Sequence, residues 1–145
     1  MHQDVYKAYH RATHTVAKTR QVVMLYDGAL RNLKQAKDAM VAGDVPTRFQ
    51  KLVRAGDIIM GLQSSLDFDA GGDVAKILYD FYSSLDARIL STLNSNNTEL
   101  VDQLMQEIRD MRDVWETIDK QQGDVPAEPA ANSAAATLNP VTVSA

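Results

Sequence analysis

Apolar residues recur at alternating spacings of three and four along four stretches of the chain. This spacing places side chains on one face of an α-helix, whereas the side chains of a strand alternate between two faces. The pattern therefore predicts amphipathic helices that bury their apolar faces against one another. The last stretch has the clearest stripe: Val101, Leu104, Ile108, Met111, Trp115 and Ile118.

Local signals delimit these helices. Pro46 suits the first turn of the second helix, where it loses no hydrogen bond. The adjacent Gly71 and Gly72 indicate a turn before the third helix, and Thr98, followed by acidic residues, is typical of the N-cap of the fourth. The expected helices occupy about residues 15–40, 46–66, 73–93 and 98–120. Short loops between helices of this length predict an all-α fold, an antiparallel up-down four-helix bundle.

The stripe of the third helix is expected to enter the core as a set: Val74, Ile77, Leu78, Phe81, Leu85, Ile89 and Leu93. The first fourteen residues lack a clear stripe, and we expect them to dock loosely on the bundle. After Lys120 the chain is rich in Ala, Pro, Ser and Thr, which cannot offset the entropy cost of ordering. The sequence thus predicts an N-terminal segment (1–14), a helical domain (15–120) and a disordered tail (121–145).

Composition excludes several classes of protein. The chain has no cysteine, which excludes disulfide scaffolds, cysteine-liganded zinc, iron–sulfur centres and thiol nucleophiles. The N-terminus lacks the apolar region of a signal peptide, and no apolar run reaches the roughly 18 residues that span a membrane. We therefore expect a soluble, cytoplasmic protein without membrane insertion.

Catalytic and metal-binding patterns are weak. His10 and His14 share a helical face but have no third ligand nearby. The acidic stretch that begins at Asp67 has Leu78 where a calcium loop needs its bidentate glutamate. All three histidines lie within the first fourteen residues, so the acidic fourth helix cannot form a Glu-x-x-His di-metal site. We expect no enzyme, no cofactor and no metal.

The net charge of −4 conceals an uneven distribution. Residues 1–54 contain ten Lys/Arg and four Asp/Glu, a balance of +6, and the remainder has a balance of −10. Such a split is compatible with a helical adaptor whose basic half binds nucleic acid or an acidic partner. We favour pairing of basic with acidic helices inside the bundle. The pI of about 5.2 means that the chain carries a net negative charge at neutral pH, and its acidic half would repel a polyanion. The basic set is Lys7, Arg11, Lys18, Arg20, Arg31, Lys34 and Lys37.

More apolar residues are present than a single stripe per helix requires. Residues 22–26 are consecutively apolar, as are residues 58–60, and Tyr79 and Tyr82 lie beside the third stripe. A broad, fully buried bundle face would account for them. A surface groove that receives an amphipathic partner helix is the alternative, with Met and Tyr as adaptable contacts. Periodicity alone leaves both open.

The block Val23-Met24-Leu25-Tyr26-Asp27-Gly28-Ala29-Leu30 resembles the flagellin-specific export chaperone family FliS. The likeness continues through Ile58-Ile59, the Gly71-Gly72 turn, Leu78-Tyr79 with Tyr82, and Arg109-x-x-Arg112-x-x-Trp115. It covers about residues 4–120. In one departure, Lys18 stands where the family usually has a proline before its first long helix, which leaves Thr15 or Thr19 as the cap.

The resemblance implies a bundle that binds the C-terminal segment of flagellin in the cytoplasm. It also implies prevention of premature polymerisation and delivery to the export gate of the flagellar type III secretion apparatus. Tyr6 and Tyr9 would cover part of the groove in the free chaperone, and an uncovered groove also allows a homodimer. The expected groove residues are Met24, Leu25, Ile58, Ile59, Leu62, Tyr79 and Tyr82.

Overall fold

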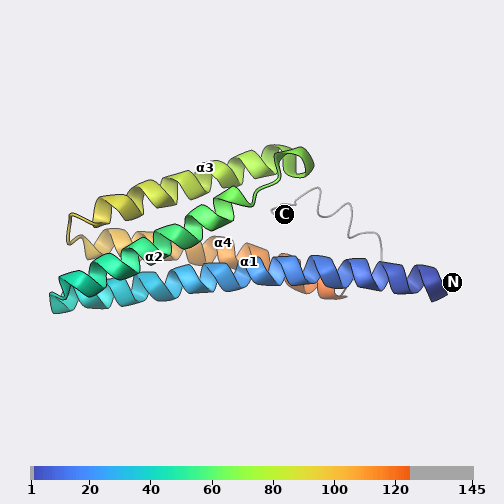
Figure 1. The fold of residues 1–145 in the computed structure, drawn as a ribbon, viewed down its shortest axis with the longest axis horizontal. Helices are drawn as coiled ribbons and strands as arrows, with labels where there is room; N and C mark the ends of the chain where they lie inside the picture. The colour runs from blue at the N-terminus through green and yellow to red at the C-terminus, as the bar shows by residue number, and fades with distance from the viewer. Residues whose placement is uncertain (1, 125–145) are drawn as a thin grey trace.

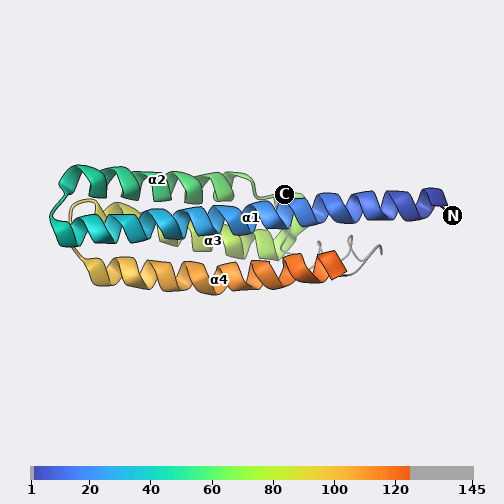
Figure 2. The ribbon, with the colours of Figure 1, turned by 90° about the horizontal axis from the view of Figure 1, so that it is seen from below.

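Four helices make up the part of the chain that the computed structural model describes, which comprises residues 2–124 and the side chains of residues 18–121. Consecutive helices run antiparallel (Figure 1), and α1 lies between α2 and α4 in the view of Figure 2. No strand occurs within residues 2–124. The predicted all-α, antiparallel four-helix bundle is therefore confirmed. The helices are α1 (His2–Ala42), α2 (Val45–Ser64), α3 (Phe68–Thr92) and α4 (Thr98–Asp124).

The turn between α1 and α2 is made by a glycine and an aspartate. Gly43 adopts a φ of 76°, a left-handed conformation that glycine tolerates best. The amide of Asp44 donates to the carbonyl of Ala39 at 2.9 Å, which completes a Schellman motif. The Asp44 carboxylate then accepts a hydrogen bond from the Thr47 amide at 3.1 Å and caps α2.

The other two turns are also closed by polar caps. Asp67 accepts from the amide of Ala70 at 3.0 Å at the start of α3. Asn97 accepts from the amide of Leu100 at 3.0 Å, so Asn97, one residue before the predicted Thr98, caps α4. Helix α3 begins at Phe68, before the expected turn. That turn is a kink inside the helix, because Gly72 has φ 53° and ψ −128°.

Helix α1 begins at His2 instead of near residue 15, which corrects the expected helix boundary. A proline at position 18 would remove a backbone hydrogen bond and break a helix, and Lys18 does neither. The first turns of α1 therefore extend past the ends of the other helices (Figures 1 and 2). Helix α4 likewise continues to Asp124 instead of ending at residue 120. Residues 125–145, most of the predicted tail, lie outside the described part.

The core forms where the four stripes meet. Trp115, Tyr26 and Tyr82 are its largest fully buried side chains. One member of the predicted α3 stripe is wrong, because Ile77 is 61% exposed. The buried face of α3 runs instead through Leu78, the residue after Ile77, and continues at spacings of three and four. It includes Leu78, Tyr82, Leu85 and Ile89.

Charge pairing joins α1 to α4, as the uneven charge distribution predicts. Arg20 of α1 donates to Glu116 at 3.1 Å, and its Nε donates to Asp119 at 3.0 Å. Lys37 pairs with Asp102 at 2.8 Å near the other end of the interface. Hydrogen bonding from Arg20 lowers the pKa of Glu116, so this carboxylate stays ionised. Part of the basic first half is thus neutralised within the bundle.

A buried hydroxyl pair links α1 to α3. The Tyr26 and Tyr82 oxygens lie 2.8 Å apart, and both residues are fully buried. Their rings meet edge to face, with centroids 6.2 Å apart. Burial raises the pKa of both phenols, so the pair stays protonated, and the hydrogen bond between the two hydroxyls depends on both residues.

Replacing either tyrosine of this pair with phenylalanine should lower the free energy of unfolding by about 1–3 kcal/mol, because the remaining hydroxyl stays buried without that partner. The double variant Tyr26→Phe/Tyr82→Phe should lose less than the sum of the two single losses. Urea unfolding of all four chains measures this coupling. Tyr79→Phe, at a 44% exposed position, is the control. Strictly additive losses would contradict the proposed dependence.

Candidate functional site

Exposed apolar side chains line the edge where α2 meets α1. A Cβ added at Gly28 would lie 3.4 Å from Cδ1 of Ile58, so these two positions face each other across the helix pair. Met24 and Leu25 precede Gly28 by about one turn and lie on its side of α1. They are 61% and 42% exposed, and Ile58 is half-buried. We call Met24, Leu25 and Ile58 the α1 flank of α2.

A second apolar edge lies where α2 meets α3. Gln63 of α2 donates to the carbonyl oxygen of Tyr79 at 3.0 Å, and a Cβ added at Gly56 would lie 3.5 Å from a carboxylate oxygen of Asp86. On α2, exposed apolar residues lie on the same side of the helix as Gly56 and Gln63. On α3, they lie on the same side as Tyr79. We call this set the α3 flank of α2: Phe49, Val53, Met60, Tyr79 and Leu90.

The α3 flank is long enough for a helix of several turns. Phe49 and Met60 are eleven positions apart, which corresponds to about 16 Å along a helix axis. Phe49, Met60 and Leu90 are each 54–55% exposed. Phe68 extends the strip, since its ring centroid lies 5.8 Å from that of Tyr79. Together the two flanks place exposed apolar side chains on both sides of α2, a pattern typical of a protein-binding surface.

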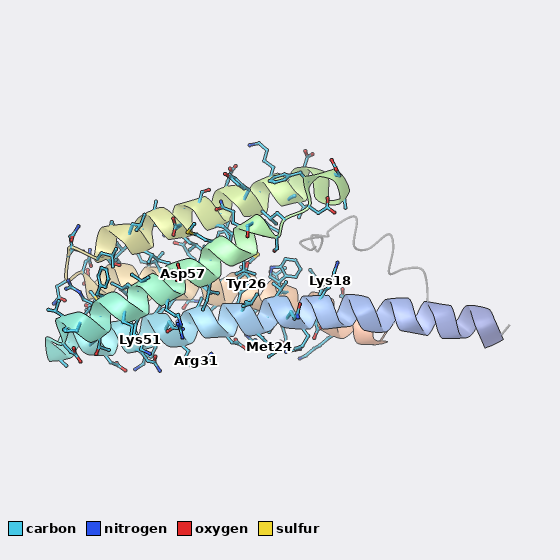
Figure 3. All side chains as sticks on the ribbon, viewed as in Figure 1. Lys18, Met24, Tyr26, Arg31, Lys51 and Asp57 are labelled. Atoms are coloured by element: carbon cyan, nitrogen blue, oxygen red, sulfur yellow. The ribbon has the colours of Figure 1, made fainter. Side chains whose placement is uncertain are left out.

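The seven groove residues expected from sequence do not share one face. Met24, Leu25 and Ile58 lie on the α1 flank, and Tyr79 lies on the α3 flank. The other three are core residues, each at most 1% exposed: Ile59, Leu62 and Tyr82. In Figure 3 Met24 lies along the outer edge of α1, while Tyr26 lies among the helices. The side chains of Tyr6 and Tyr9 lie outside the described part, so their capping role stays a prediction.

Sequence reasoning missed three residues of the α3 flank: Phe49, Val53 and Leu90. Phe49 and Val53 do follow a helical spacing of four, but they lie beside the stronger stripe that contains Leu52 and Ile59. Helical spacing identifies which residues share a face. It does not reveal where the neighbouring helix stops covering that face, and this decides exposure.

The basic set predicted from sequence is divided by the fold. Arg20 and Lys37 pair with acids of α4, and Lys34 pairs with Asp38 at 2.9 Å on its own helix. Lys18 and Arg31 make no ion pair with the residues whose side chains are described. Figure 3 shows Arg31 and Lys51 along the outer edge of the α1–α2 pair. The side chains of Lys7 and Arg11 lie outside the described part.

Comparison with known proteins identifies the fold's family. The chain matches the family described as "FliS: Flagellar protein FliS" over residues 1–122. The chain belongs to the FliS family. Among its relatives is the flagellar secretion chaperone FliS of Vibrio cholerae, 35% identical over 67% of this chain and 71% of that protein. The flagellar secretion chaperone FliSB of Pseudomonas aeruginosa is 31% identical over 68% and 79%, respectively.

Family membership supports a chaperone role in flagellar export. The FliS protein of Salmonella typhimurium, also a flagellar secretion chaperone, is 29% identical over 67% of this chain and 73% of its own length. Within the described residues, no helix is long and apolar enough to cross a membrane. Nor do their side chains form a group of three or more potential metal ligands. The apolar flanks of α2 are thus the candidate functional site of this FliS-family chain.

Proposed function

We propose that this chain is a cytoplasmic, non-enzymatic chaperone that binds the C-terminal region of flagellin. It prevents flagellin from polymerising prematurely and delivers it to the export gate of the flagellar type III apparatus. The family match supports this function, together with the names of the relatives. The structural observation that carries the proposal is the pair of exposed apolar flanks along α2.

The two flanks favour a client, the protein that a chaperone binds, that is flexible before it binds. A rigid partner helix would cover one flank, whereas a disordered segment that folds on binding can wrap α2 and cover both. Such a segment would bury Leu25 and Ile58 on one side and Phe49 and Tyr79 on the other. The apolar residues of flagellin that pack on these flanks would then be unavailable for contacts between flagellin molecules, and polymerisation would be prevented.

Calorimetric titration with a peptide of the last forty or so residues of flagellin tests the proposal. Binding should be accompanied by a negative heat-capacity change, the mark of buried apolar area. A flagellin peptide of equal length from the N-terminal region is the control and should bind much more weakly. Absence of binding at tens of micromolar would contradict the proposed function.

The salt dependence separates this function from the adaptor hypothesis. Affinity for an apolar client should change little with ionic strength. Binding of nucleic acid or of an acidic partner through the basic half should instead weaken steeply with salt, because counterions are released on binding. A steep loss of affinity between 50 and 200 mM salt, on the order of 10³-fold, would favour the adaptor.

A further inference from the structure

A small cavity lies at the end of the bundle where the α1–α2 turn meets the α3–α4 loop. Its volume is about 210 Å³, several times the share of one water molecule in the liquid. Met40 and Val45 supply apolar wall, and Arg48 and Asn96 supply polar groups. The cavity is therefore large enough for one side chain together with a polar group, and its lining suits both.

Within the described part of the chain, the Arg48 guanidinium is held by neutral groups and not by an ion pair. Its two terminal nitrogens donate to neutral acceptors, the carbonyl of Leu93 at 2.9 Å and the side-chain oxygen of Asn96 at 3.3 Å. Among the described residues no carboxylate lies within 4 Å of the guanidinium. The third nitrogen, Nε, is buried without a hydrogen-bond partner. A guanidinium without a direct carboxylate contact has room for an anion as a partner, on the side away from the Asp44 carboxylate that also lines the cavity.

The cavity is continuous with the apolar α3 flank. Val45 lines the cavity, and Phe49 follows it by four residues on the same side of α2. A peptide lying along Phe49 and Val53 would thus arrive at Arg48 with its end. The apolar lining distinguishes this site from a general anion site, because a free phosphate or acetate would leave the exposed side chain of Val45 uncovered.

We propose that this cavity receives the last residue of the client peptide. The terminal carboxylate binds Arg48, and the terminal side chain packs against Met40 and Val45. Such a cavity recognises the end of a chain, because internal segments of the same composition have no terminal carboxylate. The proposal rests on the proposed function, since it assumes that the C-terminal segment of the client lies along the α3 flank.

Asp44 also lines the cavity and constrains where the carboxylate can lie. Hydrogen bonds from Thr47 lower the pKa of Asp44, so its carboxylate is ionised and repels a second anion. The terminal carboxylate must therefore lie on the side of Arg48 and Asn96. There the terminal guanidinium nitrogens and the Asn96 amide group are the donors that the carboxylate would meet, since Nε itself is buried.

The test compares two forms of the same C-terminal flagellin peptide, one with a free carboxylate and one amidated. The free acid should bind the full chain at least about tenfold more tightly than the amide, the usual scale for a charge-assisted hydrogen bond. In the variant Arg48→Gln the two forms should bind equally, each as weakly as the amide binds the unaltered chain. Arg54→Gln removes an exposed cation of the same helix and should preserve the difference.

The outcomes are distinct. Equal binding of the acid and the amide to the unaltered chain overturns the cavity proposal and leaves the proposed function standing. Failure of both forms to bind overturns the proposed function, and the cavity proposal with it. Arg48→Gln also removes hydrogen bonds to the α3–α4 loop, so its thermal unfolding is compared with that of the unaltered chain. If the variant unfolds early, the comparison of acid and amide on the unaltered chain decides.

Discussion

The triple variant Leu25→Ser/Phe49→Ser/Tyr79→Ser should bind the C-terminal segment of flagellin at least about 100-fold more weakly than the unaltered chain. Each of the three side chains is a partly exposed apolar anchor, 42–55% accessible. Truncating an anchor of this kind costs about 1 kcal/mol or more. Because both flanks lose anchors, the loss should exceed that of any single substitution.

Stability and specificity controls accompany this variant. Substitution at exposed positions usually changes the free energy of unfolding by less than about 0.5 kcal/mol per site, so the variant should remain folded. Ile77→Ser/Val114→Ser is the matched control, since both residues are more than 50% exposed. Ile77 lies on the same side of α3 as Arg88, and Val114 lies on the same side of α4 as Glu107. Arg88 and Glu107 form an ion pair between α3 and α4, so this edge faces away from α2. Equal loss of binding in this control would place the client between α3 and α4.

The variant Trp115→Ala should lose about 3–5 kcal/mol of the free energy of unfolding, the range for removing a buried aromatic side chain. Trp115 is the largest fully buried side chain and is 1% exposed. It lies on α4, and its indole N–H is close enough to lower the pKa of Tyr26 against the larger, opposite effect of burial. Removing it therefore opens a cavity beside the tyrosine pair of α1 and α3.

Such a loss is a large fraction of the 5–15 kcal/mol typical of a small domain. Circular dichroism at increasing urea concentration measures it, because Trp115 is the single tryptophan and its fluorescence is absent from the variant. Trp115→Phe keeps much of the ring volume and should lose clearly less. A change below about 1 kcal/mol for Trp115→Ala would show that the core relaxes into the space.

Several features of the fold followed from local chemistry. Helical spacing predicted four helices, and Pro46 marks the start of α2 within one residue of the observed one, whereas α3 begins at Phe68, before the predicted start at about residue 73. Such signals act over one or two turns, so they are readable without the tertiary structure. The start of α1 was misjudged, because a capping threonine near residue 15 permits a helix start and does not compel one.

The candidate site was harder to predict than the fold. Four of the seven groove residues that the family resemblance suggested are exposed or half-buried on the flanks of α2. Ile59 and Leu62 are adjacent to Ile58 or one turn away, yet they are buried. Neighbouring positions on a helix differ by about 100° in direction. The position of the next helix therefore decides which of them a partner can reach.

The amino-acid sequence alone determined the helices, their order, their antiparallel arrangement and the family, because periodicity, caps and short loops are local properties. Only the tertiary structure decided that Ile77 is exposed, that Tyr26 meets Tyr82, and that Arg20 is neutralised while Arg48 is left without a carboxylate partner. Each of these depends on residues far apart in the chain, at distances set by how the helices pack. The apolar flanks of α2 and the cavity at Arg48 arise at that level.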